Sequence, residues 1–239
     1  MKDIEQFIFE RLKRNVDFKW LQFTCKEDFY IAGNSLNNST PNDIDIFPSS
    51  IDQFSDIEAN LNQEFDKILS KTRNSITVKH NGMTYQFCNY YHNSLKELVD
   101  SFDFSHIKIG AFIKVNEDFE DDIHSFNQFY MSEEYKNSKI IGDTEYSKSE
   151  YPLSSLIRTF KYFKRGDFSG KSYMVSVISI ITDIVERGFK DYKDFKDQLD
   201  AVDLGLLPDD LELFKPWDNT LKRLYNSLTK GKNISEDEK

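Results

Sequence analysis

The chain has 239 residues, which suits one large domain or two small ones. Its 31 basic and 41 acidic residues give a net charge of −10, which argues against a general nucleic-acid-coating protein but is compatible with a local basic groove. The two cysteines, Cys25 and Cys88, belong to no CxxC pair or Cys/His cluster, so the sequence argues against structural zinc and against a disulfide framework.

The first half of the chain mixes the apolar spacings of helices and strands. Helices are predicted over 2–14, 55–69 and 94–101, and strands over 28–32, 43–47, 75–79, 83–90 and 102–115. Asn81-Gly82 separates two of these strands and predicts a tight hairpin turn. Gly110 predicts a bulge or kink in the last strand. Residues 116–122 carry five acids, and the composition up to about residue 149 is loop-like.

The second half predicts helices only, over 153–165, 172–187, 191–200 and 217–228. The sequence therefore predicts an α+β fold, in which a mixed sheet with flanking helices is followed by an all-helical domain. We expect a first domain over 1–145, a helical domain over 146–228, and a polar, disordered tail over 229–239.

No segment has the pattern of a membrane span. The most apolar stretch, residues 173–185, contains several polar residues and is shorter than the roughly 18 unbroken apolar residues that a span needs. The N-terminus is charged and amphipathic and has no apolar signal-peptide core. We expect a soluble, cytoplasmic protein without a membrane partner.

The most informative stretch is IAGNSLNNSTPNDIDIF, residues 31–47. A hydrophobic pair leads into the turn Gly33-Asn34-Ser35, whose backbone N–H groups are available to an anion. Asp43 and Asp45 follow on a predicted strand, where alternation places both side chains on one face, about 7 Å apart. Taken alone, Asp-Ile-Asp is also typical of a solvated edge strand. Together with the upstream turn, it predicts a phosphate site beside a metal site.

Two carboxylates on one rigid strand repel each other unless a positive group lies between them. Mg²⁺ is the expected occupant, with Mn²⁺ as the alternative, because hard cations bind carboxylates together with substrate phosphates. Asp103, at the start of the apolar stretch 102–115, is the candidate for a third carboxylate. Its alternative role is that of an ordinary charge at the N-terminal end of a strand.

A second candidate surface is the predicted helix 153–165. Helical spacing places Arg158, Lys161 and Arg165 on one face, while Leu156, Phe160 and Phe163 can face the core. Residues 146–171 carry six basic and two acidic residues, so this part of an acidic chain is locally positive. The pattern fits a surface that faces phosphate or RNA, and it also fits an ordinary solvated helix face.

Other catalytic arrangements find no support in the spacing. His80 falls in the predicted hairpin turn, and His106 is expected to face away from Asp103 on the same strand. The spacing of the sequence assigns no catalytic partner to His92 or His124. No GxxxxGK[ST] motif is present, so the sequence argues against a P-loop.

Four segments together resemble the nucleotidyltransferase superfamily that includes DNA polymerase beta, and more closely the small nucleotidyltransferase-like proteins of phage genomes. The matching segments are YIAGNS (30–35), NDIDIF (42–47), SFDFSHIKIGA (101–111) and LIRTFKYFKRG (156–166). They occur in the family's order and cover roughly residues 28–170. One departure is Asn34, which stands where the family usually has Gly or Ser; Asn adopts unusual backbone angles more readily than most residues.

The resemblance implies a nucleotidyltransferase-type sheet and a set of site residues. By it, Gly33, Asn34 and Ser35 would hold the triphosphate of an NTP, and Asp43, Asp45 and Asp103 would hold the metal. It also implies contacts from the basic helix to the nucleotide, which would come from Arg158, Lys161, Tyr162 and Arg165.

Three hypotheses for the function follow. The first is a Mg²⁺-dependent nucleotidyltransferase that moves an NMP from an NTP to an acceptor hydroxyl by two-metal catalysis. The resemblance allows a tRNA end, another RNA, a protein hydroxyl or a small molecule as the acceptor. The second hypothesis is a catalytically silent nucleotide- or RNA-binding module of the same fold, and the third is a purely structural or host-interaction protein.

Overall fold

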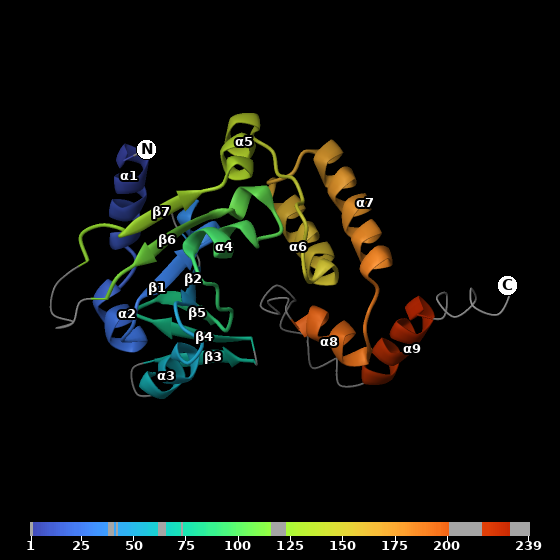
Figure 1. Cartoon of the computed structure of the whole chain (residues 1–239), viewed down its shortest axis with the longest axis horizontal. Helices are drawn as coiled ribbons and strands as arrows, with labels where there is room; N and C mark the ends of the chain where they lie inside the picture. Colours follow the sequence, from blue (N-terminus) through green and yellow to red (C-terminus); the bar gives the residue numbers. More distant parts are fainter. Residues whose placement is uncertain are drawn as a thin grey trace, which may run out of the picture. The chain divides into compact units, whose positions relative to one another are not determined.

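The computed structural model describes residues 2–37, 41, 43–61, 66–72, 74–115, 123–200 and 217–229. The chain forms two compact units, Met1–Gly142 and Asp143–Lys239 (Figure 1). Within the described ranges, no helix is long and apolar enough to cross a membrane. The acidic segment 116–122 and residues 230–239 of the predicted tail lie outside the described residues.

The first unit is built on one mixed sheet with the strand order β3-β4-β5-β2-β1-β6-β7. All neighbouring strands run antiparallel except β2 and β5, which run parallel. The bounds are β1 Phe29–Ala32, β2 Asp43–Pro48, β3 Lys67–Lys71, β4 Ser75–His80, β5 Met83–Cys88, β6 Ile109–Ile113 and β7 Gln128–Met131. This sheet and the helices of both units confirm the predicted α+β class.

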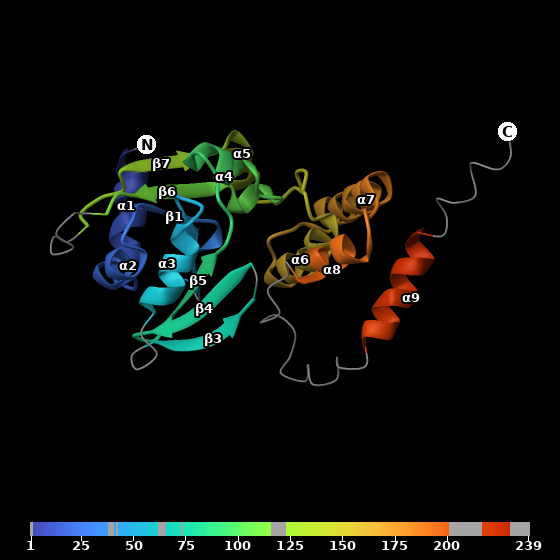
Figure 2. The same ribbon diagram turned by 60° about the horizontal axis from the view of Figure 1, so that its bottom comes forward.

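Helices cover the two faces of the sheet unequally. The described helices of this unit are α1 Lys2–Lys13, α2 Phe18–Cys25, α3 Gln53–Asn60, α4 Leu95–Asp100 and α5 Glu133–Ile141. One face packs against α1, α2 and α3 in the main core, to which β2 contributes the fully buried Ile44 and Ile46. On the other face, α4 packs against β6 and β7 (Figure 2). Burying each large apolar side chain of this core stabilises the fold by about 1.5–3 kcal/mol.

The predicted hairpin is confirmed in detail. Asn81 and Gly82 both have positive φ, +48° and +85°, as a two-residue turn between antiparallel strands requires. Helix α4 begins after Ser94, whose side chain accepts a hydrogen bond from the N–H of Glu97, so the predicted helix 94–101 has a capped start.

Two predicted elements are wrong in part. The helix predicted over 55–69 ends at Asn60, and Lys67–Lys71 forms β3 because it pairs with β4. The strand predicted over 102–115 is confined to β6, Ile109–Ile113, and a short 3₁₀ turn, Ser105–Ile107, precedes it. Helix α2, strand β7 and helix α5 were not predicted, since short segments of this kind are stabilised by tertiary packing more than by local pattern.

Gly110 corrects a third expectation. The register of β6 against β1 is continuous from Phe29 opposite Ile113 to Ala32 opposite Gly110, so the predicted bulge is absent. A Cβ atom on Gly110 would instead lie 2.7 Å from Cγ2 of Val99 and 2.8 Å from Cδ1 of Leu95. The glycine is required because α4 packs directly on the strand at this point.

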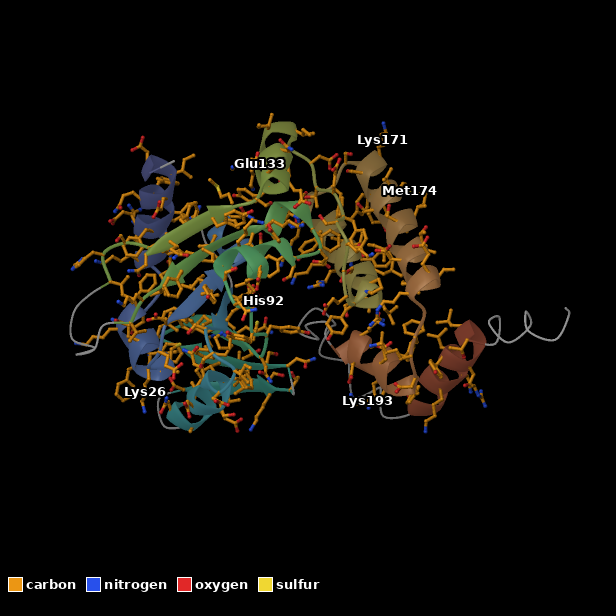
Figure 3. The ribbon with its side chains drawn as sticks, in the orientation of Figure 1. Lys26, His92, Glu133, Lys171, Met174 and Lys193 are labelled. Carbon is orange, nitrogen blue, oxygen red and sulfur yellow. The ribbon has the colours of Figure 1, made fainter. Side chains whose placement is uncertain are left out.

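The second unit is helical in its described residues, with α6 Pro152–Arg165, α7 Gly170–Arg187, α8 Tyr192–Asp200 and α9 Trp217–Thr229. Phe160 and Phe163 do not face a core as expected: they are 54% and 45% exposed, and Phe163 stacks on Tyr173 of α7. Met174, also on α7, lies on that helix's exposed face (Figure 3).

Candidate active site

The turn after β1 is positioned by a glycine that no other residue could replace without strain. Gly33 has φ +88° and ψ −149°, a region in which only glycine is stable, and its N–H donates to the carbonyl of Ile109 at 2.9 Å. A Cβ atom built on Gly33 would lie 3.5 Å from Oδ2 of Asp45. A side chain at residue 33 would therefore be in van der Waals contact with one of the two predicted metal-binding carboxylates, so the predicted phosphate turn lies beside that carboxylate.

Asn34 and Ser35 form the 3₁₀ turn η1, Asn34–Leu36, directly after Gly33. Asn34 does not have positive φ, since Lys26 and Asn81 are the non-glycine residues that do so among those described. Asparagine at this position is therefore compatible with the turn, because Gly33 alone adopts the unusual backbone angles.

Ser35 is the clearest sign of a ligand in this turn. Its side chain is 2% exposed, and within the described residues its Oγ has no hydrogen-bond partner. A buried hydroxyl without a partner costs about 1–3 kcal/mol, so such groups are rare and often functional. A phosphate oxygen that accepted a hydrogen bond from Oγ would remove this cost.

A network of long-range hydrogen bonds fixes the end of the turn. Asn37 donates through Nδ2 to the carbonyl of His106 and accepts at Oδ1 from the hydroxyl of Tyr135, at 2.5 Å. Arg11 of α1 donates to the carbonyl of Leu36 at 2.5 Å. Segments from three other parts of the chain therefore bind the end of the turn, and we call Arg11, Asn37 and Tyr135 the turn latch.

Asp43 and Asp45 lie on β2 with the alternation that the sequence predicted. Both are half-buried, whereas Ile44 and Ile46 between and after them are fully buried in the main core on the opposite face. On their own face, Asp43 lies directly opposite Thr84 of β5. Asp45 lies directly opposite Gln86 of the same strand. The two carboxylates thus belong to the sheet face that α1, α2 and α3 leave open.

Asp103 is not on a strand, contrary to the expectation, but in the segment that precedes the turn Ser105–Ile107. It is 3% exposed. The residues around it are held beside the candidate site: the ring of Phe102 lies 5.8 Å from that of Phe47 at the end of β2, and the carbonyl of His106 accepts the bond from Asn37. Because His106 lies in this turn, the expectation that it faces the opposite side of a strand is also wrong.

Asp43 and Asp45 together provide carboxylate oxygens of the kind that a hard divalent cation binds. Among the described residues, no group of three His, Cys, Asp or Glu side chains is arranged to hold a metal ion. Mg²⁺ commonly binds through one or two protein carboxylates together with substrate phosphates and water, so Asp43 and Asp45 satisfy its requirement. A role for Asp103 as a third ligand stays a prediction.

The four remaining predicted contacts belong to α6 in the second unit. Tyr162 is buried, Arg158 and Lys161 are half-buried, and Arg165 is exposed one residue before Gly166, which ends the helix with φ +82°. Their assignment as contacts for the nucleotide stays a prediction.

A surface depression of about 390 Å³ lies away from this site, beside α2 and the β4–β5 turn. Its His80 stacks on Trp20 with 4.2 Å between ring centroids, and His80 Nδ1 lies 2.8 Å from Oδ1 of Asp66. Trp20 in turn contacts the rings of Tyr85 and Phe87, which belong to the main core. These interactions are those of a packed structural histidine.

The sequence did not identify Thr84, Gln86 or the turn latch as part of this region. Thr84 and Gln86 become neighbours of the carboxylates only because β5 pairs in parallel with β2, and the hairpin pattern of β4 and β5 carries no information on that pairing. Asn37 and Tyr135 are 98 residues apart, and no local pattern indicates their contact.

No protein-family model matches the chain, and no curated protein matches it in sequence. Solved structures match it at low identity. The Thermotoga maritima CCA-adding enzyme complexed with tRNA is 13% identical with a TM-score of 0.48, and the match covers 80% of this chain and 50% of that one. A CCA-adding enzyme in complex with CTP is 12% identical with a TM-score of 0.49, and the match covers 80% and 50%.

A tRNA nucleotidyltransferase complexed with a primer tRNA and an incoming ATP analogue is 12% identical with a TM-score of 0.44, and the match covers 89% of this chain and 62% of that one. The chain thus spans about half to three fifths of the length of the structures it matches. Similarity at this level concerns the fold alone. The resemblance to phage-encoded proteins stays a prediction.

Proposed function

We propose that this protein is a metal-dependent nucleotidyltransferase that transfers an NMP from an NTP to an acceptor hydroxyl. The observation that supports this most directly is that the turn lies beside the carboxylate of Asp45. A Cβ atom on Gly33 would lie 3.5 Å from Asp45, and the same turn buries the hydroxyl of Ser35, which has no hydrogen-bond partner among the described residues. A triphosphate bound at Ser35 would therefore lie next to carboxylates able to bind a cation.

Each residue of the site has a defined role in this proposal. Ser35 Oγ donates to a phosphate oxygen, and Gly33 lets the backbone approach the phosphates without a side chain in between. Asp43 and Asp45 would hold Mg²⁺ or Mn²⁺, which when bound supplies positive charge against the triphosphate. Positioning and charge of this kind are what phosphoryl-transfer chemistry chiefly requires of a protein.

The reaction is an in-line displacement. The acceptor oxygen forms a bond to the α-phosphorus, the bond from that phosphorus to the oxygen that bridges to the β-phosphorus breaks, and pyrophosphate leaves. We assign Asp103 as the group that receives the proton of the acceptor hydroxyl and passes it to solvent. Its burial and its position in a segment tied to both β2 and Asn37 support this role.

The test supplies each NTP, radiolabelled at the α-phosphate, with Mg²⁺ or Mn²⁺ and a total cell lysate. Label is expected on an RNA band, tRNA included, or on a protein band. The variant Asp43→Asn/Asp45→Asn should lose the signal by a factor on the order of 100 or more. Asp52→Asn is the matched control, because Asp52 is exposed and its side chain forms no capping hydrogen bond.

Two other outcomes would favour the remaining hypotheses. Binding of NTP with Mg²⁺ in a thermal-shift assay, without label transfer to any acceptor, would indicate a silent nucleotide-binding module. No NTP binding at all would indicate a structural or interaction protein. Equal labelling by the wild type and by Asp43→Asn/Asp45→Asn would contradict the proposal.

A further inference from the structure

The segment 67–96 has an unusual charge pattern for this chain. It contains no Asp or Glu, although the chain has 41 acidic residues and a net charge of −10. Its basic residues are Lys67, Lys71, Arg73, Lys79 and Lys96. The segment forms β3, β4 and β5, which continue the sheet outward from the strand that carries Asp43 and Asp45.

The register of these strands aligns polar side chains in two rows across the sheet, each of which starts at one of the two carboxylates. Directly paired residues project from the same face, so each row shares the face of Asp43 and Asp45. The first row is Asp43, Thr84, Lys79 and Lys67, and the second row is Asp45, Gln86, Thr77 and Ser70. We call the six residues beyond the carboxylates the lysine face.

Among the described residues of the first unit, no helix packs on the lysine face. The described helix that packs on this side of the sheet is α4, and it contacts β6 and β7 at the other end (Figure 2). Lys67, Ser70 and Lys79 are exposed, and Thr77, Thr84 and Gln86 are half-buried. On β4 and β5, the alternate residues, such as Val78 and Tyr85, are fully buried in the main core. The face is therefore a polar surface on a rigid support.

Its two lysines are placed where they repel each other. Lys67 and Lys79 are directly opposite across β3 and β4, an arrangement that destabilises a sheet when the charges are alike. Among the ion pairs of the described residues, none includes either lysine. By contrast, Lys71, on the opposite face of β3, pairs with Glu58 of α3. A bound polyanion would attract both lysines and so offset the repulsion between them.

The strand order also separates this face from the triphosphate. Gly33 and Ser35 follow β1, which flanks β2 on one side, whereas the lysine face begins on β5, which flanks β2 on the other. In-line displacement requires that the attacking oxygen and the leaving pyrophosphate lie on opposite sides of the α-phosphorus. The lysine face is thus on the side of the carboxylates from which an acceptor would approach.

The size of the face fits a polymer. With strands about 4.8 Å apart, Lys79 lies about 10 Å and Lys67 about 14 Å from the backbone of Asp43, measured across the sheet. A small acceptor held at the carboxylates would not reach either lysine, whereas a nucleic acid strand has a phosphate at every nucleotide. The hydroxyl and amide groups of Thr84 and Gln86 are suited to the 2′-hydroxyl groups that distinguish RNA from DNA.

We propose that the lysine face binds the 3′-terminal segment of a single-stranded RNA acceptor, with backbone phosphates at Lys79 and Lys67 and the terminal hydroxyl at Asp43 and Asp45. This inference rests on the proposed nucleotidyltransferase function and names its acceptor. Thr84 and Gln86 contact the sugars of the last nucleotides.

The test measures binding of a fluorescent single-stranded RNA oligonucleotide by anisotropy over a range of salt concentrations. Each phosphate contact contributes about 0.7 to the slope of log K against log salt for a single strand, so Lys67→Gln/Lys79→Gln should lower the slope by about 1.4. Lys71→Gln is the control: it removes one lysine charge from β3, the strand of Lys67, on the opposite face, and its slope should equal that of the wild type. Thermal unfolding verifies that both variants are folded.

Three results would overturn the inference. The first is a slope unchanged in Lys67→Gln/Lys79→Gln, and the second is an equal reduction in Lys71→Gln. The third is displacement of the RNA by polyglutamate or by single-stranded DNA of the same sequence as effectively as by unlabelled RNA, which would show a general anion surface. Thr84→Val/Gln86→Leu should reduce the preference for RNA over DNA, and an unchanged preference would overturn the sugar contacts.

Label transfer separates this inference from the proposed function. If the wild type binds RNA through the lysine face but transfers no label to any acceptor, the proposed function is wrong and the proposed RNA-binding face is supported. If the wild type and Lys67→Gln/Lys79→Gln label RNA at the same rate at subsaturating RNA concentrations, the proposed RNA-binding face is wrong and the proposed function is supported. NTP binding should be unchanged in the double lysine variant, because Ser35 lies on the other side of β2.

Discussion

The backbone of Gly33 lies so close to Asp45 that a Cβ atom on residue 33 would be 3.5 Å from Oδ2 of that carboxylate. Two features 12 residues apart in the sequence are therefore one site in the fold. This proximity depends on backbone angles, φ +88° and ψ −149°, that only glycine adopts without strain.

Gly33→Ala should consequently damage both the fold and the site. The backbone strain is expected to cost about 1–3 kcal/mol of unfolding free energy and to raise KM for NTP, because relief of the strain displaces the turn from Asp45. Gly142→Ala is a useful comparison, since Gly142 also has positive φ, +71°, but no atom within 4 Å of the added Cβ. That variant should lose about 1 kcal/mol of stability with KM unchanged. An equal rise in KM for both would show that the effect is global.

Ser35→Ala should have opposite effects on stability and on binding. Removing a buried hydroxyl that has no partner in the described part of the chain should leave the unfolding free energy unchanged or raise it by up to about 1 kcal/mol. KM for NTP should rise about tenfold through the loss of one hydrogen bond to a charged phosphate. Ser154→Ala is the contrast, because Ser154 Oγ donates to the carbonyl of Gln198 and its loss should destabilise the fold. Destabilisation by Ser35→Ala would argue against a ligand-directed hydroxyl.

The turn latch should act on the position of Ser35 and not on the chemical step. Burial raises the pKa of Tyr135 to about 12, so its hydroxyl keeps the proton that it donates to Asn37 at neutral pH. Tyr135→Phe leaves Oδ1 of Asn37 without this donor, which should cost about 1 kcal/mol and raise KM for NTP severalfold with kcat little changed. Asn37→Ala should show a larger rise in KM. A fall in kcat at constant KM would exclude a positioning role.

Much of the backbone geometry of this region could be predicted from the sequence, because it depends on residues that are close in the chain. The turn, the strand alternation of Asp43 and Asp45 and the Asn81-Gly82 hairpin each depend on neighbours a few residues away. Asp103 was placed in the wrong element, because the apolar run 102–115 has the composition of a strand while its first half forms a 3₁₀ turn. No local signal reports which side of β2 a later strand will join.

The errors elsewhere have the same physical origin. Ile68 and Leu69 continue the apolar spacing of α3, yet they belong to β3 because β4 offers hydrogen-bonding partners there. Phe160 and Phe163 fit a core-facing pattern on α6, but both are exposed, and the buried residues of this helix include the small polar Ser155 and Thr159. Both outcomes depend on contacts with residues distant in the sequence, and the local sequence pattern does not indicate those contacts.

Gly110 provides a test of how closely α4 approaches the sheet. Gly110→Ala should destabilise the protein by about 1–3 kcal/mol, because the new methyl group would overlap Cγ2 of Val99 and Cδ1 of Leu95. Val99→Ala in the same chain should restore part of the loss, which a double-mutant cycle on the unfolding free energies would reveal. Strict additivity of the two changes would mean that the strand or the helix shifts instead.

At the start of the second unit, the carboxylate of Asp143 makes the stability of the protein depend on pH. Partial burial alone would raise the pKa of Asp143, but hydrogen bonds from the side chains of Ser169 and Ser172 and from the N–H groups of Ser169 and Thr144 outweigh it and lower the pKa to about 2. The pKa in the folded state is thus below the usual value, so the stabilisation is complete above about pH 4 and is lost as the pH falls toward 2.

Asp143→Asn should therefore lower the unfolding free energy by about 1–2 kcal/mol at neutral pH, since the amide cannot replace all the charge-assisted bonds. Between pH 4 and pH 2 the difference between wild type and variant should shrink, because the wild-type carboxylate becomes protonated. Thermal unfolding of both proteins across this range measures the difference directly. A constant difference would show that Asp143 contributes through packing and not through its charge.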